Sequence, residues 1–232
     1  MKAKDRIKDM ILNQEELLAV FVGDSHMWGE GARGWSTALK PPAVAGELRR
    51  LPDSIPSFAN LFTGHLKALR PDKSGTYTIN SGFGSTSTKK YLVNYWNQGV
   101  EVYKPDIVVI EFAINDWLEQ NAVSLEEFHS NLEYMIARTI LLSAVPIVLT
   151  VSPILGSLYS GKNYYPDFIE ETRKIAGGRD DVILADANRL MMDFLNTGSR
   201  EHCEAELFDD CWHVAQKGQE LYLQALTGAI GL

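Results

Sequence analysis

Cysteine is scarce in this chain, since only Cys203 and Cys211 occur among its 232 residues. Two cysteines cannot build the set of several bridges that stabilises a disulfide-rich secreted domain. Because both lie in one loop-like stretch, a single local bridge stays open as an alternative. We expect two reduced thiols.

Long apolar runs and an excess of basic residues are also lacking. No run approaches the roughly 18 apolar residues of a membrane span, and Met1 to Arg6 leads into mixed charges rather than the apolar core of a signal peptide. We therefore expect a cytoplasmic protein without a membrane span. The formal net charge of -8 argues against nucleic acid and anionic membranes as partners, and a small neutral or cationic substrate is easier to accommodate.

Metal and nucleotide motifs are weak or missing. No His-x-x-x-His or Cys-x-x-Cys spacing occurs, so we expect no metal and no cofactor. The run from Gly29 to Gly34, Gly-Glu-Gly-Ala-Arg-Gly, matches the dinucleotide fingerprint literally. In a nucleotide-binding fold, however, these glycines follow the strand directly and open a long helix. Here several residues intervene and Pro41-Pro42 follows soon after, which argues against nucleotide binding.

Five short apolar runs rich in Val and Ile alternate with longer helical patterns. Unbroken apolar strands separated by helices predict a parallel sheet buried on both faces, and hence a three-layer α/β/α sandwich. The length suits one large domain. We expect it to span residues 1–232, with its core at about 18–228 and a helical extension over 1–16. The predicted strands are Leu17 to Val22, Tyr77 to Ile79, Ile107 to Phe112, Ile147 to Val151 and Val182 to Ala185.

Two segments keep the apolar spacing of amphipathic helices. One runs from Phe58 to Leu69 and the other from Phe128 to Ile140. Ser124, followed three residues later by Glu127, resembles a capping box that opens the second helix.

A serine stands at the tip of the first predicted strand, in Gly23-Asp24-Ser25. A serine hydroxyl becomes a nucleophile only beside a general base, and that base needs an orienting partner. Asp210 and His213, three residues apart, are able to supply both, because their side chains lie on one side of a turn. Taken alone, the Asp210 and His213 pair also fits an ordinary helix N-terminus.

Polar groups follow the second and third predicted strands at the same sheet edge. Asn115 comes after the third strand, and Gly84 lies in a glycine-rich turn after the second. The tetrahedral intermediate of ester hydrolysis needs donors aimed at its oxyanion. The side-chain amide of Asn115 and backbone N–H groups at Ser25 and near Gly84 would meet that need.

The sequence thus contains four short blocks: Gly23-Asp24-Ser25, the glycine-rich turn near Gly84, the segment with Asn115, and the Asp210 and His213 pair. Their order resembles that of the four blocks of the SGNH hydrolase superfamily, also called GDSL esterases and lipases. The resemblance extends from residue 18 to about 228 and implies a flavodoxin-like fold and a serine esterase that works through an acyl-enzyme. It implies that Ser25 is the nucleophile, His213 the base and Asp210 its partner. Asn115 would donate to the oxyanion through its side chain.

The chain departs from the family pattern at three points. His26 stands where the motif has Leu, and Ala113 replaces the usual Gly before Ile114-Asn115. In the second block the oxyanion glycine aligns with either Ser85 or Gly84. We favour Gly84, because a glycine adopts a strained turn more readily.

The substrate is less determined than the chemistry. Trp28, Trp117 and Trp212 each lie within three residues of a proposed catalytic group, where they wall a substrate pocket or pack in the core. The tyrosine-bearing loop from Ser152 to Pro166, with no long apolar lid, favours a short acyl group such as acetyl on a carbohydrate. A lipase or thioesterase acting on longer chains and a non-catalytic binding module are the alternatives. The sequence leaves the oligomeric state open.

Overall fold

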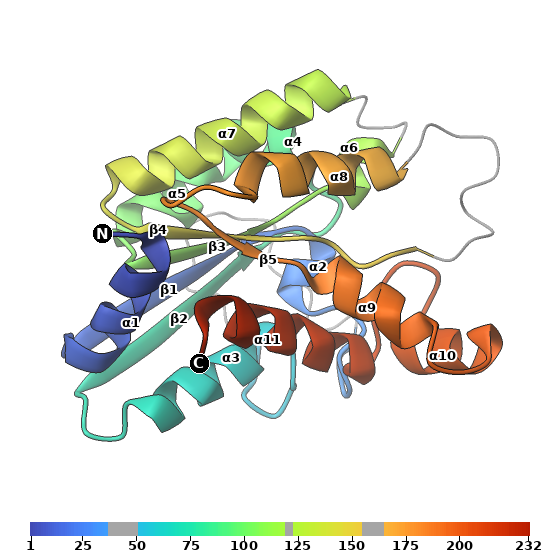
Figure 1. Ribbon diagram of the computed structural model, residues 1–232, viewed down its shortest axis with the longest axis horizontal. Helices are drawn as coiled ribbons and strands as arrows, with labels where there is room; N and C mark the ends of the chain where they lie inside the picture. Colours follow the sequence, from blue (N-terminus) through green and yellow to red (C-terminus); the bar gives the residue numbers. More distant parts are fainter. Residues whose placement is uncertain (37–50, 119–122, 155–164) are drawn as a thin grey trace.

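The protein is described by a computed structural model that covers residues 1–36, 51–118, 123–154 and 165–232 (Figure 1). Its centre is a five-stranded sheet in the order β2-β1-β3-β4-β5, in which all neighbouring strands are parallel. The predicted parallel sheet and α/β/α architecture are thereby confirmed. The strands are β1 (Glu16–Gly23), β2 (Gly75–Gly82), β3 (Ile107–Glu111), β4 (Val145–Leu149) and β5 (Ile183–Ala185).

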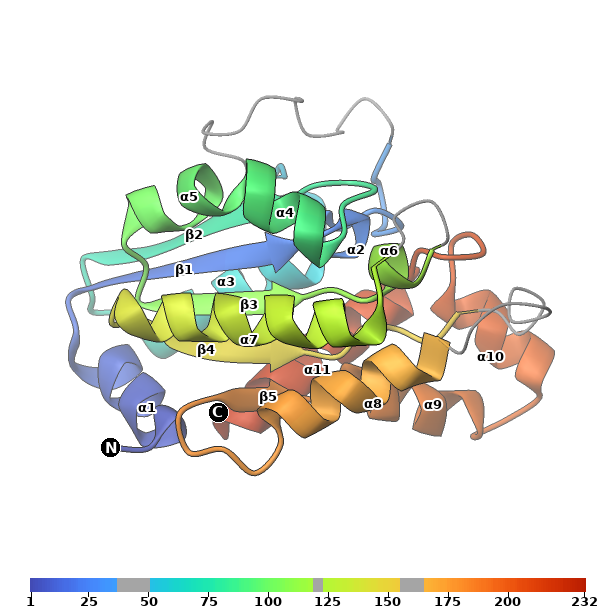
Figure 2. The same ribbon diagram turned by 90° about the horizontal axis from the view of Figure 1, so that it is seen from above.

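Helices cover both faces of the sheet, as Figures 1 and 2 show. Side chains alternate along a strand, so Ala19 and Phe21 enter one core while Val20 and Val22 enter the other. The first core packs against α1 (Ala3–Asn13), α3 (Phe58–Leu69), α9 (Ala187–Leu195), α10 (Arg200–Leu207) and α11 (Gln216–Ile230). The second packs against α4 (Thr88–Asn94), α5 (Trp96–Gly99), α7 (Leu125–Leu141) and α8 (Tyr165–Ala176), with a short 3-10 helix, η2 (Glu101–Tyr103), after α5.

The two predicted amphipathic helices are present. The Phe58 to Leu69 pattern coincides with α3, and the second pattern lies inside α7. Ser124 caps α7, because its Oγ accepts a hydrogen bond from the backbone N–H of Glu127 at 3.1 Å. The carboxylate of Glu127 pairs with Lys89 at 3.0 Å.

A buried arginine fastens α1 to the sheet. Arg70 is 3% exposed, and its guanidinium donates hydrogen bonds to the carbonyls of Met10 at 2.9 Å, Ile11 at 2.6 Å and Gln14 at 2.9 Å. These carbonyls lie at the end of α1, where the last carbonyls of a helix generally lack intrahelical partners, and Met10 additionally accepts from the N–H of Gln14 at 3.1 Å. One side chain therefore satisfies the end of the helix and fixes its place.

Strands β1 and β3 are neighbours although β2 lies between them in the sequence. From β1 the chain passes first to β2 on one side of β1 and then to β3 on the other side, so the strand order reverses at β1. In open α/β sheets the carboxyl ends of the strands at such a switch point form the ligand crevice. Gly23 of β1 pairs with Glu111 of β3 at this edge. The residues that follow these two strands therefore face a common space.

The cysteines and the lengths of the helices bear on two further predictions. Cys203 is buried and Cys211 exposed, and both are free thiols, as predicted. Among the residues that the structure describes, no helix has the length and apolar content that crossing a membrane would require.

Candidate active site

Ser25 lies at the carboxyl end of β1. It is the first residue of a short helix, α2 (Ser25–Trp28), and Asp24 caps this helix by accepting a hydrogen bond from the N–H of His26 at 2.9 Å. Gly23 is required here for close packing rather than for a left-handed turn, since a Cβ would lie 2.6 Å from the Glu111 carbonyl and 2.6 Å from Cβ of Met27. The missing side chain lets the turn fold tightly against β3.

His213 and Asp210 lie in the loop between α10 and α11. The loop is closed by an antiparallel bridge between Phe208 and Val214. Oδ1 of Asp210 accepts hydrogen bonds from the backbone N–H groups of Trp212 and His213, both at 2.7 Å. The turn therefore holds the carboxylate in place before it meets the imidazole.

Ser25, His213 and Asp210 form one hydrogen-bonded chain. Nδ1 of His213 lies 2.8 Å from Oδ2 of Asp210, and Nε2 lies 3.0 Å from Oγ of Ser25. A carboxylate only accepts, so Nδ1 carries the proton and Nε2 of the neutral ring is left to accept from the serine hydroxyl. Partial burial works against ionisation of Asp210, but hydrogen bonds from His213 and the loop amides outweigh it and lower the pKa of this carboxyl.

Asn115 reaches the same crevice from the end of β3. It lies in a short helix, α6 (Ile114–Trp117), and its Nδ2 donates to Oδ2 of Asp24 at 2.7 Å. Asp24 is fully buried, and burial raises the pKa of its carboxyl to about 6, although hydrogen bonds from His26 and Asn115 oppose the shift. One carboxyl thus caps α2 and orients the amide of Asn115.

The turn after β2 brings Gly84 next to Ser25. A Cβ on Gly84 would lie 4.0 Å from Cβ of Ser25 and 3.5 Å from Oε1 of Glu30. The left-handed residue of this turn is Ser85, with a φ of 56°, and not Gly84. Our reason for favouring Gly84, a strained backbone, was therefore wrong. What favours Gly84 is instead that it has no side chain at a position next to Ser25.

Glu30 was not identified from the sequence as part of this site. Its Oε2 lies 3.6 Å from Nε2 of His213, the same nitrogen that contacts Ser25, and its side chain is 9% exposed. In the sequence it is hidden inside the glycine run that resembles a dinucleotide fingerprint. That run follows α2, and its first glycine, Gly29, is the left-handed C-cap of this helix.

A layer of buried polar side chains beneath the site was also missed. His26 packs against His213 with ring centroids 5.3 Å apart, and burial lowers the pKa of His26 to about 3, so its ring is neutral. Tyr222 of α11 donates to Glu111 at 3.2 Å and accepts from the N–H of Ser152 at 2.8 Å. Burial raises the pKa of Glu111 well above its usual range. Only the fold reveals this layer, because its members come from four distant segments.

The three tryptophans differ in their surroundings. Trp28 is 4% exposed and packs with Ala32, Leu51 and Ile55, whereas Trp117 is 7% exposed and contacts the ring of Tyr165. Trp212 is partly buried against the second core. A substrate-binding role for the three stays a prediction.

The loop expected to roof the pocket runs from Ser152 to Pro166, and residues 155–164 lie outside the described residues. Tyr165, which we expected in this polar loop, is instead the first residue of α8 and fully buried. Its hydroxyl donates to the carbonyl of Ser152 at 2.9 Å.

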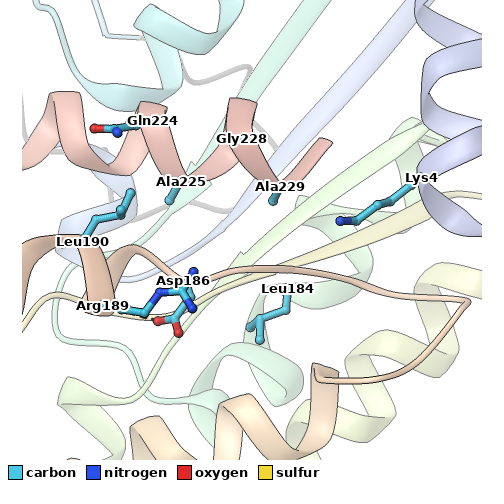
Figure 3. A pocket seen from close by; sticks show the side chains of 9 residues that line it. All are labelled: Lys4, Leu184, Asp186, Arg189, Leu190, Gln224, Ala225, Gly228 and Ala229. Carbon is cyan, nitrogen blue, oxygen red and sulfur yellow. Dashed lines mark hydrogen bonds between the residues drawn. The ribbon is translucent and has the colours of Figure 1, made fainter. Parts of the chain in front are cut away.

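A cavity of about 460 Å³ lies elsewhere, beside the edge strand β5 and between α1, α9 and α11 (Figure 3). None of the residues that line it belongs to the Ser25 site. Its lining consists of Lys4, Leu184, Asp186, Arg189, Leu190, Gln224, Ala225, Gly228 and Ala229.

A flavodoxin-like sheet with a serine after its first strand and an Asp-x-x-His before its last helix defines an SGNH-type hydrolase. Residues 20–226 match the family described as GDSL-like Lipase/Acylhydrolase, and the chain belongs to this family. The resemblance inferred from the sequence is confirmed, and the protein is a carboxylic ester hydrolase. A search of curated protein sequences finds no match.

Solved structures share the fold at low sequence identity. LAE5, an alpha/beta hydrolase enzyme from the metagenome of Lake Arreo, Spain, is 21% identical with a TM-score of 0.73, over 93% of this chain and 95% of that one. Axe2, an acetylxylan esterase from Geobacillus stearothermophilus, is 21% identical with a TM-score of 0.71, over 93% and 94%. At this level of identity, the similarity shows the fold.

Proposed function

We propose that Ser25 is the nucleophile of a short-chain carboxylic esterase, with His213 as general base and Asp210 as its orienting partner. The observation that supports this proposal most directly is the hydrogen-bonded chain from Asp210 through His213 to Oγ of Ser25, with contacts of 2.8 and 3.0 Å. This arrangement is the one that serine hydrolases on unrelated folds have in common.

The proposed reaction has two symmetrical halves. His213 takes the proton of Ser25 as Oγ attacks the ester carbonyl, and the imidazolium then gives that proton to the leaving alcohol, which leaves an acyl-enzyme. Water repeats the sequence, and Oγ leaves with the proton that His213 took from the water. Asp210 stabilises the imidazolium in both halves.

The oxyanion would be held by the backbone N–H groups of Ser25 and Gly84 and by Nδ2 of Asn115. An amide nitrogen carries two hydrogens. Because Asn115 donates one of them to Asp24, the direction of the other is fixed in advance. The hydrogen bonds from such preorganised donors strengthen as charge develops on the oxygen, and the donors need no rearrangement during the reaction.

For the substrate, we infer a small acyl group such as acetyl, carried by a carbohydrate or a similar polyol. The nearly buried carboxylate of Glu30 lies beside Nε2 of His213, which protonates the leaving alcohol, and it supports a polar alcohol, because an alkyl group packed against it would remove its remaining solvation. The name of Axe2, an acetylxylan esterase, points in the same direction.

A panel of p-nitrophenyl esters with acyl chains of graded length tests the acyl preference. Each buried methylene normally contributes about 0.8 kcal/mol of binding, so a lipase-like site would show kcat/KM rising steadily with chain length. We expect acetyl and butyryl esters to be preferred over octanoyl and longer ones. A steady rise through ten or more carbons would favour the lipase or thioesterase alternative.

Labelling with a fluorophosphonate tests the nucleophile independently of the acyl group. The parent should be modified at Ser25, as seen by peptide mass spectrometry, and Ser25→Ala should not be labelled. A parent that is neither labelled nor active on any ester would support the non-catalytic binding module instead.

A further inference from the structure

The short helix α6, which carries Asn115, is too short to be stable by its own hydrogen bonds. It spans Ile114–Trp117, and Ala113 at its N-cap has no side-chain acceptor. A single helical turn is marginal in water, because forming it fixes several backbone angles for little hydrogen bonding. The position of the Asn115 amide therefore depends on the contacts that α6 makes with the rest of the fold.

Asp116, the next residue of α6, makes one of these contacts. It is 1% exposed, and its Oδ1 accepts two hydrogen bonds from Thr88 of α4, one from the backbone N–H at 3.0 Å and one from the hydroxyl at 2.5 Å. Nδ2 of Asn131, in α7, donates to the same hydroxyl oxygen at 3.0 Å, so the hydroxyl hydrogen is left for Asp116. Asp116 thus links α6 to α4 and, through Thr88, to α7 (Figure 2).

Thr88 is also one end of the turn that carries Gly84. The start of this turn is held by the N–H of Phe83, which donates to the last carbonyl of β1 at 3.0 Å. Within the turn, the hydroxyl of Thr86 donates to the carbonyl of Gly84 at 3.3 Å. At the other end Thr88 is the first residue of α4. The contact with Asp116 therefore fixes the turn at the end where α4 begins.

Two donors of the proposed oxyanion hole thus lie on segments that one buried link holds together. Asn115 directly precedes Asp116, and Gly84 lies four residues before Thr88. Thr88 is 0% and Asp116 1% exposed, so water does not compete for the hydrogen bonds between them. A misplacement of about 1 Å at an active site can cost about a hundredfold in rate, so the spacing of these donors matters.

We propose that Asp116 is a positioning residue for the reaction, which through Thr88 holds the amide of Asn115 and the N–H of Gly84 at the spacing that the oxyanion requires. The inference rests on the proposed function and adds a residue that does not touch the substrate. The oxyanion develops only in the transition state. Loss of the link should therefore lower kcat and change the binding of the ester much less.

Substitutions at both ends of the link test the proposal with p-nitrophenyl acetate as substrate. Asp116→Ala removes the acceptor, whereas Asp116→Asn keeps an acceptor oxygen. Thr88→Val removes the hydroxyl at similar volume, and Thr88→Ser keeps it. Thr139→Val is the matched control. Thr139 is 0% exposed, like Thr88, but its hydroxyl donates to the carbonyl of Met135 within its own helix, at 2.8 Å.

We expect Asp116→Ala to lower kcat by about tenfold, less than the loss of the donor itself in Asn115→Ala, with KM changing less than about threefold. Thr88→Val should lower kcat by about three- to tenfold. Asp116→Asn and Thr88→Ser should stay within about threefold of the parent. Thr139→Val should keep the kcat of the parent, although urea unfolding shows a loss of stability comparable to that of Thr88→Val.

Inhibition by 1,1,1-trifluoroacetone gives a readout that a purely structural role would not change. Oγ of Ser25 bonds to the ketone carbon while its proton passes to His213, and the ketone oxygen becomes a lasting oxyanion. Ki should rise in Asp116→Ala and Thr88→Val about as much as kcat falls. In an Asn115→Ala background, Asp116→Ala should cost less than it does in the parent, because the donor that it positions is absent.

Parent-like kcat and Ki in both Asp116→Ala and Thr88→Val would overturn the proposal. Losses that Thr139→Val shares, or a raised KM with unchanged kcat, would overturn it as well. If Asp116→Ala does not fold, the comparison of Thr88→Val with Thr88→Ser decides instead. A parent that is neither labelled by a fluorophosphonate nor active on any ester would refute the proposed function. A labelled and active parent with unaffected variants would refute only the role of Asp116.

Discussion

The two halves of the candidate site are built in opposite ways. Ser25, Asn115 and Asp24 lie at the carboxyl ends of central strands and are 9%, 6% and 0% exposed. The side chains of His213 and Asp210 lie in one loop and are 19% and 47% exposed. In the buried half each of these side chains has a partner from another segment. In the exposed half the partners of Asp210 lie within three residues, and His213 alone also reaches another segment, at Ser25.

This contrast extends to electrostatics. Burial raises the pKa of Asp24, while the hydrogen bonds of the loop lower the pKa of Asp210. The buried half therefore holds a carboxyl group whose ionisation is opposed by burial, and the exposed half holds one whose ionisation is favoured by hydrogen bonds. Substitutions in the buried half should affect both stability and catalysis, and those in the exposed half mainly catalysis.

The largest effect is expected for the contact between the two halves, made by Ser25 and His213. Ser25→Ala and His213→Ala should each lower kcat on p-nitrophenyl acetate by about 10⁴- to 10⁶-fold, and the double variant should be no worse than either, because the residues act as a unit. Steady-state rates of the parent and the variants at equal protein concentration measure this. Residual activity within tenfold of the parent in Ser25→Ala would refute the assignment of the nucleophile.

Within the exposed half, Asp210→Asn should lower kcat by about 10² to 10⁴-fold, since the neutral amide no longer stabilises the imidazolium. The adjacent Asp209→Asn should stay within about twofold, as substitutions at exposed positions usually do. A comparison of kcat for the two variants decides the matter. If Asp209→Asn shows the larger loss, the wrong carboxylate has been assigned.

In the buried half, Asn115→Ala should lower kcat by about a hundredfold with a smaller change in KM, since the amide acts mainly on the transition state. It should also lower the free energy of unfolding by about 1–3 kcal/mol, because buried Asp24 loses a donor. His213→Ala is the control for stability and should cost about 0.5 kcal/mol or less. Equal stability losses in urea unfolding would contradict the contrast between the two halves.

The smallest expected effect concerns pH. Asp116 lies in α6 with its carboxyl buried, and burial raises its pKa from 3.8 to about 7. An acid with a raised pKa binds its proton more tightly in the folded state, so its contribution to stability is present below pH 3.8 and lost as the pH rises through about 7.

Replacing Asp116 by Asn, which does not titrate, should therefore stabilise the fold more at high pH than at low pH. The free energy of unfolding of Asp116→Asn minus that of the parent should be about 2 kcal/mol higher at pH 8 than at pH 5, so the variant gains stability relative to the parent as the pH rises. The difference for Asp210→Asn should be equal at the two pH values, because its pKa is already lowered below 3.8. Urea unfolding at both values measures it, and a pH-independent difference for Asp116→Asn would contradict the prediction.

The sequence predicted the sheet well because its central strands are unbroken apolar runs, and it predicted their ends less well. The expected Tyr77 to Ile79 strand extends to Gly82, since Asn80 and Ser81 continue it, with the amide of Asn80 directed toward α2 and the hydroxyl of Ser81 toward Tyr91 of α4. Asn80 donates to the carbonyl of Met27 at 2.8 Å. Strand β4 begins at Val145, before Pro146, a residue that usually argues against a central strand.

The site residues also differ in how well the sequence predicts them. Residues with a strong local signal, such as Asp210 and His213, were identified because they are close in sequence. His26 was noted only as a departure from the motif, yet it packs against His213 across the fold. Glu30 and Glu111 carry no local pattern at all, and their roles depend on segments that only the folded chain brings together.

The loop closed by the Phe208 and Val214 bridge has a consequence for the order in which the enzyme matures. The Asp210 and His213 pair spans three residues and can form early, but the contact between His213 and Ser25 closes a separation of 188 residues. Long-range contacts form late, because chain entropy must be overcome first. In the proposed mechanism, a nascent chain whose first strand has already emerged from the ribosome therefore stays inactive until the segment that carries His213 has been synthesised and has reached Ser25.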